Sequence, residues 1–565
     1  MTAADILWRF ALPLCGGGLL IWALPPTVPP SLIRFEDVSG QSGIRAQMRC
    51  GGPEKKWIPE ANGSGAAWLD YDRDGRMDLL IVNGSTIDDL RQIVAGKVPP
   101  VRPGSLYLYR NLGDGHFQDV TAQAGLSNPY WGTGVAVADV NNDGYPDILV
   151  TNIGLDLLFR NNGNGTFTEI GREAGLSQKV AWHTGAAFGD YDGDGKLDLY
   201  VAGYVDLGAL RLDAQPPVCN YRGLPGFCGP RGLKGEADIL YHNNGNMTFT
   251  DVTLKAGVTD TGLYHGFTVV FDDFNGDGKI DIFVANDSDP NYLYLNQGNG
   301  VFKEAALPSG VAFSGDGQTQ ANMGVAVGDI DNDGLIDVLT TTFSEDYFPL
   351  FKQQSPGLYE DVSTQAGLAI VTLPWVGWAC GFTDLDNDGH KDLWAANGHV
   401  YPNADLLPTT SYLQPVAVLA NRGGKFATVP DVSGSGLKGS FRGGCAGDFN
   451  NDGRIDLLVL PIAGRPLLLE NRTESQSHWI GIQLRGSTRN RDAIGAQVRI
   501  ESCGSTQFET MRNGGSYLSG NDPRMHFGLG SCRKVDRLSI GWPGGRRQVL
   551  ENLAADRYLT VEEPR

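Results

Sequence analysis

The chain repeats short apolar runs that are separated by polar turns rich in Asp, Asn and Gly. Residues 135–138 (Val-Ala-Val-Ala) and 148–150 (Ile-Leu-Val) flank one such turn. Short apolar runs bounded by turn residues predict buried β-strands. The pattern therefore predicts an all-β protein that is built from many short strands.

A longer motif within this pattern predicts a β-hairpin. Residues 106–126 read as a strand, a turn containing Asn and Gly, and a second strand. Two apolar runs joined by such a turn are typical of a hairpin. The motif recurs at residues 157–176, 239–258 and 293–311, and in shortened form at 358–368 and 418–437.

Between the hairpins, one nine-residue acidic loop occurs seven times with the pattern D-x-[DN]-x-D-G-x-x-D. Side-chain oxygens stand at positions 1, 3, 5 and 9, and the Gly at position 6 permits a sharp turn. Each loop leads directly into an apolar strand. We number as loops 1 to 7 the residues 70–78, 139–147, 190–198, 273–281, 329–337, 384–392 and 448–456.

This arrangement of oxygens predicts a site for a hard divalent cation in every loop. Calcium takes six to eight oxygen ligands in irregular geometry, whereas magnesium demands a tighter octahedron. Carboxylates packed this closely would repel one another without a cation. Position 7 varies freely, so we expect its backbone carbonyl to be the ligand there. We predict up to seven calcium ions, bound by Asp70, Asp72, Asp74, Arg76 and Asp78; Asp139, Asn141, Asp143, Tyr145 and Asp147; Asp190, Asp192, Asp194, Lys196 and Asp198; Asp273, Asn275, Asp277, Lys279 and Asp281; Asp329, Asp331, Asp333, Leu335 and Asp337; Asp384, Asp386, Asp388, His390 and Asp392; and Asp448, Asn450, Asp452, Arg454 and Asp456.

Two other interpretations of the loops are less favoured. An EF-hand needs a Glu at position 12 and a helix on each side. Position 12 is instead a strand residue in every copy: Ile81, Val150, Val201, Val284, Thr340, Ala395 and Val459. A single Asp-Asn-Gly run is often an ordinary turn, but seven runs with one spacing favour a metal.

The repeat predicts a seven-bladed β-propeller followed by a small all-β domain. One period holds about four short strands and one loop, and repetition of four-stranded units is typical of propellers. Residues 35–44 read as the end of a hairpin motif, and residues 467–471 read as its missing first strand. We therefore expect the two ends to complete one blade, because such closure removes exposed sheet edges. Beyond residue 472, apolar alternation at 479–484, 496–500, 535–542 and 558–561 predicts the small domain.

The loops and hairpins together resemble the FG-GAP/VCBS repeat family, which is related to the integrin α-subunit head. Residues 490–495, 514–530 and 542–545 resemble the ASPIC/UnbV domain, which follows such propellers in the cartilage acidic protein-like group. The resemblance implies a calcium-loop propeller over residues 31–472 and an ASPIC/UnbV domain over residues 473–565. It implies little about activity, because one fold hosts many functions.

Charge and the N-terminal segment predict an exported protein. The formal net charge is −20, and the loops contain 25 of the 65 acidic residues, so most of the acidity is explained by metal binding. No basic cluster indicates a nucleic-acid partner. Residues 1–30 combine an apolar stretch with a Pro-rich linker, which predicts a signal peptide or a membrane anchor. We therefore expect an extracellular, periplasmic or cell-surface location.

Cysteines fit an oxidising compartment, where we expect two disulfide bonds. Cys219 and Cys228 flank a short loop, and Cys503 and Cys532 are the only pair in the small domain. Cys380 and Cys445 precede acidic loops and are expected to be buried free thiols, and Cys50 has no evident partner.

The residues that begin the strand before each acidic loop should surround the centre of the propeller, where propellers often bind ligands. Aromatic, His and Asn side chains gather there, as in a pocket for a sugar or peptide, although a role as packing and turn residues is the favoured interpretation. The candidates are Asn62, Trp131, His183, His265, Asn322, Trp378 and Arg442.

The function that we predict is a calcium-dependent binding or adhesion module for an extracellular glycan or protein. The chain contains no P-loop, HExxH or convincing GxSxG motif, so an enzyme is less favoured. The alternatives are a carbohydrate lyase or dehydratase on the same scaffold, which would use His183 or His265, and a lectin.

Overall fold

The computed structural model describes residues 33–176, 178–434 and 436–564. The predicted signal or anchor in residues 1–30 lies outside this range. Within it, no helix has the length and apolar character needed to cross a membrane.

The described chain is all-β, as the alternation of apolar runs predicted. Its strands before the C-terminal domain are grouped here into seven antiparallel units of four main strands each, and units 2 and 3 are joined into one eight-stranded sheet. Each unit is written here from its innermost strand outward. Unit 1 is β2 (Ala66–Leu69), β3 (Asp78–Val82), β4 (Leu106–Asn111) and β5 (Phe117–Asp119). Unit 2 is β6 (Trp131–Ala138), β7 (Asp147–Gly154), β8 (Leu157–Asn161) and β9 (Phe167–Glu169). Unit 3 is β10 (Ala181–Gly189), β11 (Asp198–Gly203), β14 (Ile239–Asn243) and β15 (Phe249–Asp251). Unit 4 is β16 (Gly266–Asp272), β17 (Asp281–Asn286), β18 (Tyr292–Asn296) and β19 (Phe302–Glu304).

The remaining units follow the same plan. Unit 5 is β20 (Val325–Gly328), β21 (Asp337–Thr340), β22 (Leu350–Ser355) and β23 (Leu358–Asp361). Unit 6 is β24 (Gly377–Thr383), β25 (Asp392–Asn397), β26 (Gln414–Asn421) and β27 (Phe426–Thr428), and the short β28 (Lys438–Gly439) pairs with β26. Unit 7 is β29 (Phe441–Gly447), β30 (Asp456–Pro461), β31 (Leu467–Asn471) and β1 (Phe35–Asp37).

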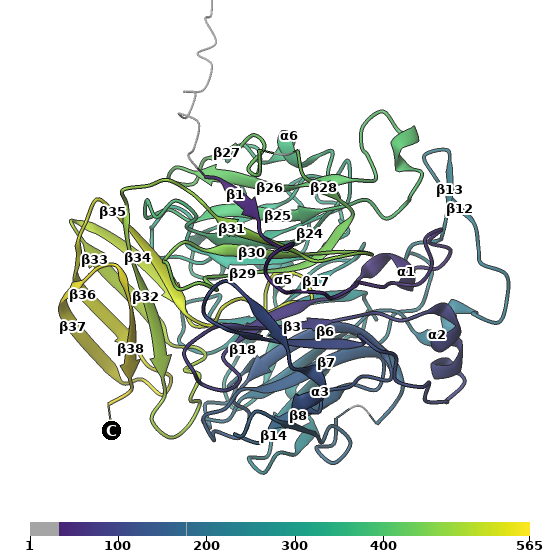
Figure 1. Ribbon diagram of the computed structural model, residues 1–565, viewed down its shortest axis with the longest axis horizontal. Helices are drawn as coiled ribbons and strands as arrows, with labels where there is room; N and C mark the ends of the chain where they lie inside the picture. The colour runs from purple at the N-terminus through teal and green to yellow at the C-terminus, as the bar shows by residue number, and fades with distance from the viewer. Residues whose placement is uncertain (1–32, 177, 435, 565) are drawn as a thin grey trace, which may run out of the picture.

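The two ends of the propeller share unit 7, as the split hairpin motif predicted. Phe35 pairs with Asn471 and Asp37 with Leu469 in antiparallel register. In Figure 1 the purple β1 lies beside the green β31. The innermost strands also contact one another in a cycle, which runs from β2 through β6, β10, β16, β20, β24 and β29 back to β2. This cycle fits a propeller-like fold, and the count of seven blades stays a prediction.

Short helices and one additional hairpin lie in the connections between the strands of the propeller. The helices are α1 (Pro59–Asn62), α2 (Ile87–Val94), α3 (Thr121–Ala124), α4 (Thr253–Ala256), α5 (Ala306–Ser309), α6 (Ala369–Thr372), and the 3-10 turns η1 (Leu207–Leu210) and η2 (Ala404–Leu406). The hairpin of β12 (Cys219–Tyr221) and β13 (Leu224–Gly226) contains the Cys219–Cys228 disulfide bond. The Cys503–Cys532 bond is also formed, and Cys50, Cys380 and Cys445 are buried free thiols among the described residues.

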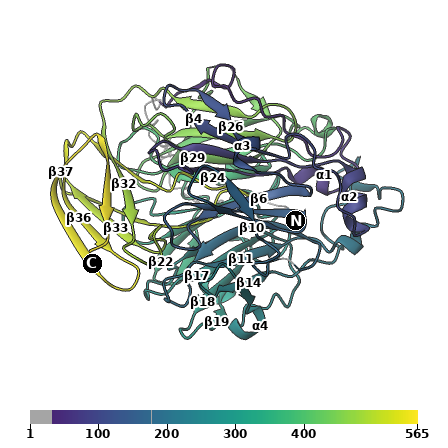
Figure 2. The ribbon, with the colours of Figure 1, turned by 60° about the horizontal axis from the view of Figure 1, so that its bottom comes forward.

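The C-terminal domain consists of two small sheets packed on a shared core. The first sheet has the order β35 (Met525–Gly530), β32 (His478–Arg485), β38 (Arg557–Glu562). The second has the order β34 (Ser505–Thr510), β33 (Gln497–Ser502), β36 (Lys534–Gly541), β37 (Arg547–Ala554). Ile480, Val498 and Phe527 belong to the buried cluster between them. The domain lies against one side of the propeller, at the left in Figures 1 and 2.

A segment of this domain fills the space that the inner strands enclose. We call residues 513–522 the channel loop. Ser516 exchanges backbone hydrogen bonds with Val325 of β20 at 2.7 and 2.8 Å, and the Leu518 carbonyl accepts from Val135 of β6 at 3.1 Å. Gly65 permits this close approach, because a Cβ there would lie 1.6 Å from the Leu518 oxygen.

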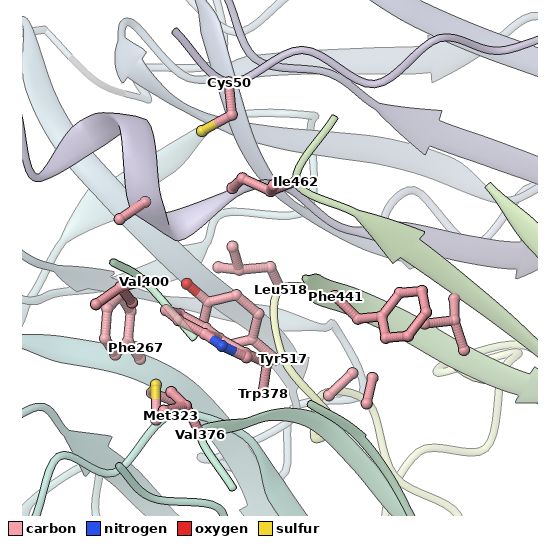
Figure 3. Close-up of a cluster of buried hydrophobic side chains, with 14 of the residues drawn as sticks. Cys50, Phe267, Met323, Val376, Trp378, Val400, Phe441, Ile462, Tyr517 and Leu518 are labelled. Atoms are coloured by element: carbon pink, nitrogen blue, oxygen red, sulfur yellow. The ribbon is translucent and has the colours of Figure 1, made fainter. Parts of the chain in front are cut away.

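Tyr517 stands at the centre of the channel loop and is fully buried. Its ring packs edge-on against Trp378 at 4.9 Å and Phe267 at 5.4 Å, and its hydroxyl donates to the Asn62 carbonyl at 3.1 Å. Figure 3 shows Tyr517 and Leu518 surrounded by Phe267, Trp378, Val400 and Ile462. The C-terminal domain therefore supplies the central core of the propeller.

Candidate metal centres

Each acidic loop joins the innermost strand of its unit to the next strand, at the end of the propeller that faces the C-terminal domain. The chain reverses direction through left-handed residues at positions 4 and 6. In loop 2 these are Asn142, with φ 59°, and Gly144, with φ 94°. Asn and Gly tolerate this region best, which explains why they dominate both positions. Arg73 of loop 1 adopts it as well, with φ 61°.

Backbone amides hold the carboxylates of the loops in a shared pattern, from which loop 3 departs because its Asp194 amide donates to Asp192 instead of Asp190. In loop 1, the amides of Asp74 and Gly75 donate to the two oxygens of Asp70 at 2.9 and 3.0 Å. The amide of Arg76 donates to Asp74 Oδ1 at 3.0 Å. The position-9 carboxylate, Asp78, accepts from the amides of Tyr71 and Asn111. The position-9 contacts recur in the other six loops.

Position 9 is the deepest point of every loop. The seven side chains, Asp78, Asp147, Asp198, Asp281, Asp337, Asp392 and Asp456, are each 0% exposed. Burial, together with the neighbouring loop carboxylates and against the amide hydrogen bonds, raises the pKa of Asp78, Asp147 and Asp281 to about 8. Burial likewise raises the pKa of Asp337 to about 7. A buried carboxylate that resists ionisation is stabilised by an opposite charge beside it, and a bound cation would supply that charge.

Several loop oxygens also lack any partner among the described residues. Asp72 Oδ1, Asp190 Oδ1, Asp331 Oδ1 and Asp386 Oδ1 are buried and make no hydrogen bond. Carboxylate oxygens converge within 4.8 Å of one another in loops 1, 3, 5 and 6. Unpaired buried oxygens are costly, so this donor set fits a hard cation. Loops 2, 4 and 7 have Asn at position 3 instead.

The Asn that ends the third strand of a unit belongs to this site, and the sequence interpretation missed it. Its backbone N–H donates a hydrogen bond to the position-9 carboxylate of its own unit. Its side chain donates to a backbone carbonyl in the loop of the preceding unit. Asn161 Nδ2 donates to the Tyr71 carbonyl at 2.9 Å, and Asn243 Nδ2 to the Val140 carbonyl at 3.1 Å. Gln353 takes this role in unit 5. The signal was present in the repeated Asn of the hairpin motif, but only the fold shows what it contacts.

The C-terminal domain covers several loops. The Asp492 carboxylate accepts from the Asp139 amide at 2.7 Å, and the Asn490 amide donates to the Gly195 carbonyl at 2.9 Å. Tyr558 donates its hydroxyl to Asp448 Oδ2 at 2.6 Å. The domain thus contacts loops 2, 3 and 7 directly.

The candidate ligand residues near the centre of the propeller are all buried. Trp131, His183, His265, Asn322, Trp378 and Arg442 are between 1% and 6% exposed. The Arg442 guanidinium lies 4.2 Å from the Trp378 ring centroid, and the Trp378 ring in turn packs against Tyr517. Because all six side chains are buried, their role in binding stays a prediction.

The two histidines that an enzyme would use are paired with carboxylates. His183 Nδ1 lies 2.6 Å from Asp156 Oδ2, and His265 Nδ1 lies 2.7 Å from Asp289 Oδ2. Burial lowers the pKa of His183, but the Asp156 carboxylate outweighs burial and the pKa is raised. The buried His183–Asp156 pair therefore joins unit 3, which holds His183, to unit 2, which holds Asp156, and 2% of the His183 side chain is exposed.

The fold and the loops together define a protein of FG-GAP-like repeats joined to a C-terminal ASPIC/UnbV domain. A family model described as FG-GAP-like repeat matches residues 88–150, 139–201, 273–340 and 384–459. A second, described as ASPIC and UnbV, matches residues 486–565. The chain thus contains FG-GAP-like repeats and an ASPIC/UnbV domain, as the sequence motifs predicted.

Its relatives include Cartilage acidic protein 1. The Mus musculus protein is 24% identical over 530 residues, which cover 88% of this chain and 73% of the relative. The Xenopus tropicalis protein is 25% identical over 523 residues, with coverages of 86% and 72%.

Solved structures resemble the chain only distantly. A structure describing recognition of non-reducing terminal N-acetylglucosamine by an Agrocybe aegerita lectin has a TM-score of 0.37 at 16% identity, covering 71% of this chain and 86% of that chain. YCF48 bound to D1 peptide has a TM-score of 0.38 at 10% identity, with coverages of 74% and 94%.

Proposed function

We propose that the chain is an exported binding module whose loops hold calcium ions, up to seven in all. The observation that carries this proposal is the position-9 carboxylate, which is fully buried in all seven loops and fixed by two backbone amides. Calcium would bind the oxygens of positions 1, 3, 5 and 9 and the position-7 carbonyl, and would supply the positive charge that these carboxylates need.

Metal binding in this design serves rigidity. Each loop connects the innermost strand of its unit, which lies beside the channel loop, to the second strand of the same unit. A cation that binds the folded loop and not the unfolded chain stabilises the fold by an amount that grows with the logarithm of its affinity. Calcium at extracellular concentration suits sites of modest affinity. The two disulfide bonds also fit an oxidising, extracellular compartment.

The partner that we propose is an extracellular glycan or protein. The centre of the propeller is occupied by Tyr517 and Leu518, so the ligand would bind elsewhere. A cavity of about 530 Å³ lies between the C-terminal domain and the acidic-loop side of the propeller. Gln483, Arg485, Asn513 and Asp522 are among its lining residues. Convergent polar groups in a cavity of this size are typical of small-ligand sites.

Elemental analysis and thermal unfolding test the metal. We expect the purified chain to contain calcium and to lose many degrees of Tm after chelation, with recovery on adding calcium back. Asp78→Asn should remove one equivalent of calcium, because it weakens the deepest ligand of loop 1. Asp114→Asn is the matched control, since Asp114 lies in an exposed hairpin turn outside the loops. A metal-free protein with an unchanged Tm in chelator would contradict the proposal.

A glycan array, run with calcium and with chelator, tests the partner. Calcium-dependent retention on defined glycans would support a lectin-type module. Failure on all glycans, together with calcium-dependent binding to an extracellular protein, would support an adhesin-type module. Turnover of a sugar without stable binding would contradict both.

A further inference from the structure

Loop 3 differs from the other six loops in what lies over it. In units 1, 3, 5 and 7, the residue before the third-strand Asn or Gln contacts the acidic loop of the same unit. In units 1 and 5 the contact is made by a cation: Arg110 Nε lies 2.9 Å from Asp72 Oδ2, and Lys352 Nζ lies 3.0 Å from Asp331 Oδ2. The residues at this position, from unit 1 to unit 7, are Arg110, Arg160, His242, Leu295, Lys352, Ala420 and Glu470.

Only His242 among these seven offers a nitrogen lone pair to a metal. We infer that loop 3 is a mixed nitrogen–oxygen site for a transition-metal ion such as zinc, with His242 as a ligand beside Asp192 and Asp198. This inference rests on the proposed function, because it assumes that the loops bind cations, and it assigns loop 3 a different metal from the rest.

The positions of the three ligand atoms support this assignment. His242 Nδ1 lies 3.3 Å from Asp192 Oδ2 and 3.2 Å from Asp198 Oδ1. Zinc binds nitrogen and oxygen at about 2.0–2.2 Å, so neighbouring ligand atoms of a tetrahedral site are about 3.3–3.6 Å apart. The two observed separations lie at the short end of this range. Nδ1 is buried and makes no hydrogen bond with the described residues, although both carboxylates are near.

The surroundings leave a fourth ligand and a route for the ion. Asp190 Oδ1 is also buried and makes no hydrogen bond with described residues, so it is available as a further oxygen ligand. The Asp194 carboxylate is instead paired with Lys196, whose Nζ contacts Asp194 Oδ2. The His242 side chain is 27% exposed, and therefore an ion can enter from solvent. The edge of the ring packs on Tyr191, which limits its rotation.

The ligand atoms of loop 3 favour a different metal from the all-oxygen ligands of the other loops. Imidazole suits zinc, copper and nickel, whereas all-oxygen sites suit calcium. The tighter bonds of a transition metal also favour few ligands in a small space. Alternatively, His242 is only a counter-charge to the carboxylates, like Arg110 and Lys352, and in that case it would bind no metal.

The experiment uses the full chain, saturated with calcium, and titrates in Co²⁺ and then Zn²⁺. We expect one equivalent of Co²⁺ to give a d–d absorption spectrum that indicates nitrogen ligation, and Zn²⁺ to displace it. His242→Leu, which installs the residue found at this position in unit 4, should abolish that equivalent. His116→Leu is the matched control, because His116 also lies beside a carboxylate but outside the acidic loops.

The calcium content of the same samples separates this inference from the proposed function. Retained calcium with no cobalt signal, or an equal cobalt signal in wild type and His242→Leu, would overturn the inference and leave the calcium proposal standing. A protein that binds no calcium at any loop would instead overturn the proposed function. Loss of the cobalt signal in His242→Leu but not in His116→Leu, at unchanged calcium content, is the result we expect.

Discussion

Asn111 Nδ2 donates a hydrogen bond to the backbone carbonyl of Phe449 at 2.8 Å, across 338 residues of sequence. Asn111 ends the third strand of unit 1, and Phe449 is position 2 of loop 7. The same contact joins each later unit to the one before it, from Asn161 to Asn471. The contact between Asn111 and Phe449 is therefore the one that closes the cycle of units.

Replacing Asn111 by Ala should open this contact and destabilise the propeller. The side chain is 1% exposed and donates to the carbonyls of both Phe449 and Met77, so its loss leaves buried acceptors unpaired. We expect a loss of about 2–4 kcal/mol in the free energy of unfolding. Chemical denaturation in calcium measures it. Asn162→Ala, in an exposed turn, is the control and should change stability by less than about 0.5 kcal/mol. Equal effects of the two variants would show that the contact between Asn111 and Phe449 does not contribute to the free energy of unfolding.

The metal-free protein should lose stability as the pH rises. The folded pKa of Asp78, Asp147 and Asp281 is about 8, whereas an Asp of the unfolded chain titrates near 4. Between these values the folded state binds more protons than the unfolded state. Stability is therefore greatest at the acid end of this window and falls as the pH rises through about 8.

Thermal unfolding of the chelated protein between pH 5 and pH 9 checks this expectation. In saturating calcium the same range should have little effect, because the ion keeps the carboxylates ionised in the folded state. A metal-free Tm that rises with pH would contradict the prediction.

Tyr517→Ala should loosen the C-terminal domain from the propeller. It removes a fully buried ring that packs against Trp378 and Phe267, and such truncations cost about 3–5 kcal/mol. Limited proteolysis between residues 472 and 477, which join the two modules, should become faster. Tyr517→Phe keeps the ring and loses only the hydrogen bond to Asn62, so its effect should be about 1 kcal/mol. Unchanged proteolysis of Tyr517→Ala would mean that docking does not depend on the channel loop.

Tyr558→Phe should weaken calcium binding at loop 7 alone. The hydroxyl donates to Asp448 Oδ2, which also accepts from the Gly453 amide at 2.7 Å, and so it orients the position-1 ligand. Loss of such an outer partner typically costs about 10–100-fold in metal affinity. Calorimetric titration of the chelated protein should show one weakened site. Tyr130→Phe, whose ring packs on Gly154 far from loop 7, should show none. Weakening of all sites by Tyr558→Phe would indicate a global effect instead.

The sequence by itself determined the features whose contacts are local. The Asp spacing fixes the loops, because Asp70 receives the amides of Asp74 and Gly75 within its own nine residues. Strand alternation and hairpin turns likewise determined the four-stranded units, and the split hairpin motif predicted the pairing of Phe35 with Asn471.

Only the tertiary structure decided which distant groups meet. Nothing near Asn111 in sequence specifies Phe449 as its acceptor, and the apolar alternation of the C-terminal domain does not predict that Tyr517 fills the centre of the propeller. His242 follows the last residue of loop 3 by 44 positions, yet β14 places it over Asp192 and Asp198. Burial and long-range hydrogen bonding depend on how whole sheets pack, and a pattern of neighbouring residues encodes only the local part of that packing.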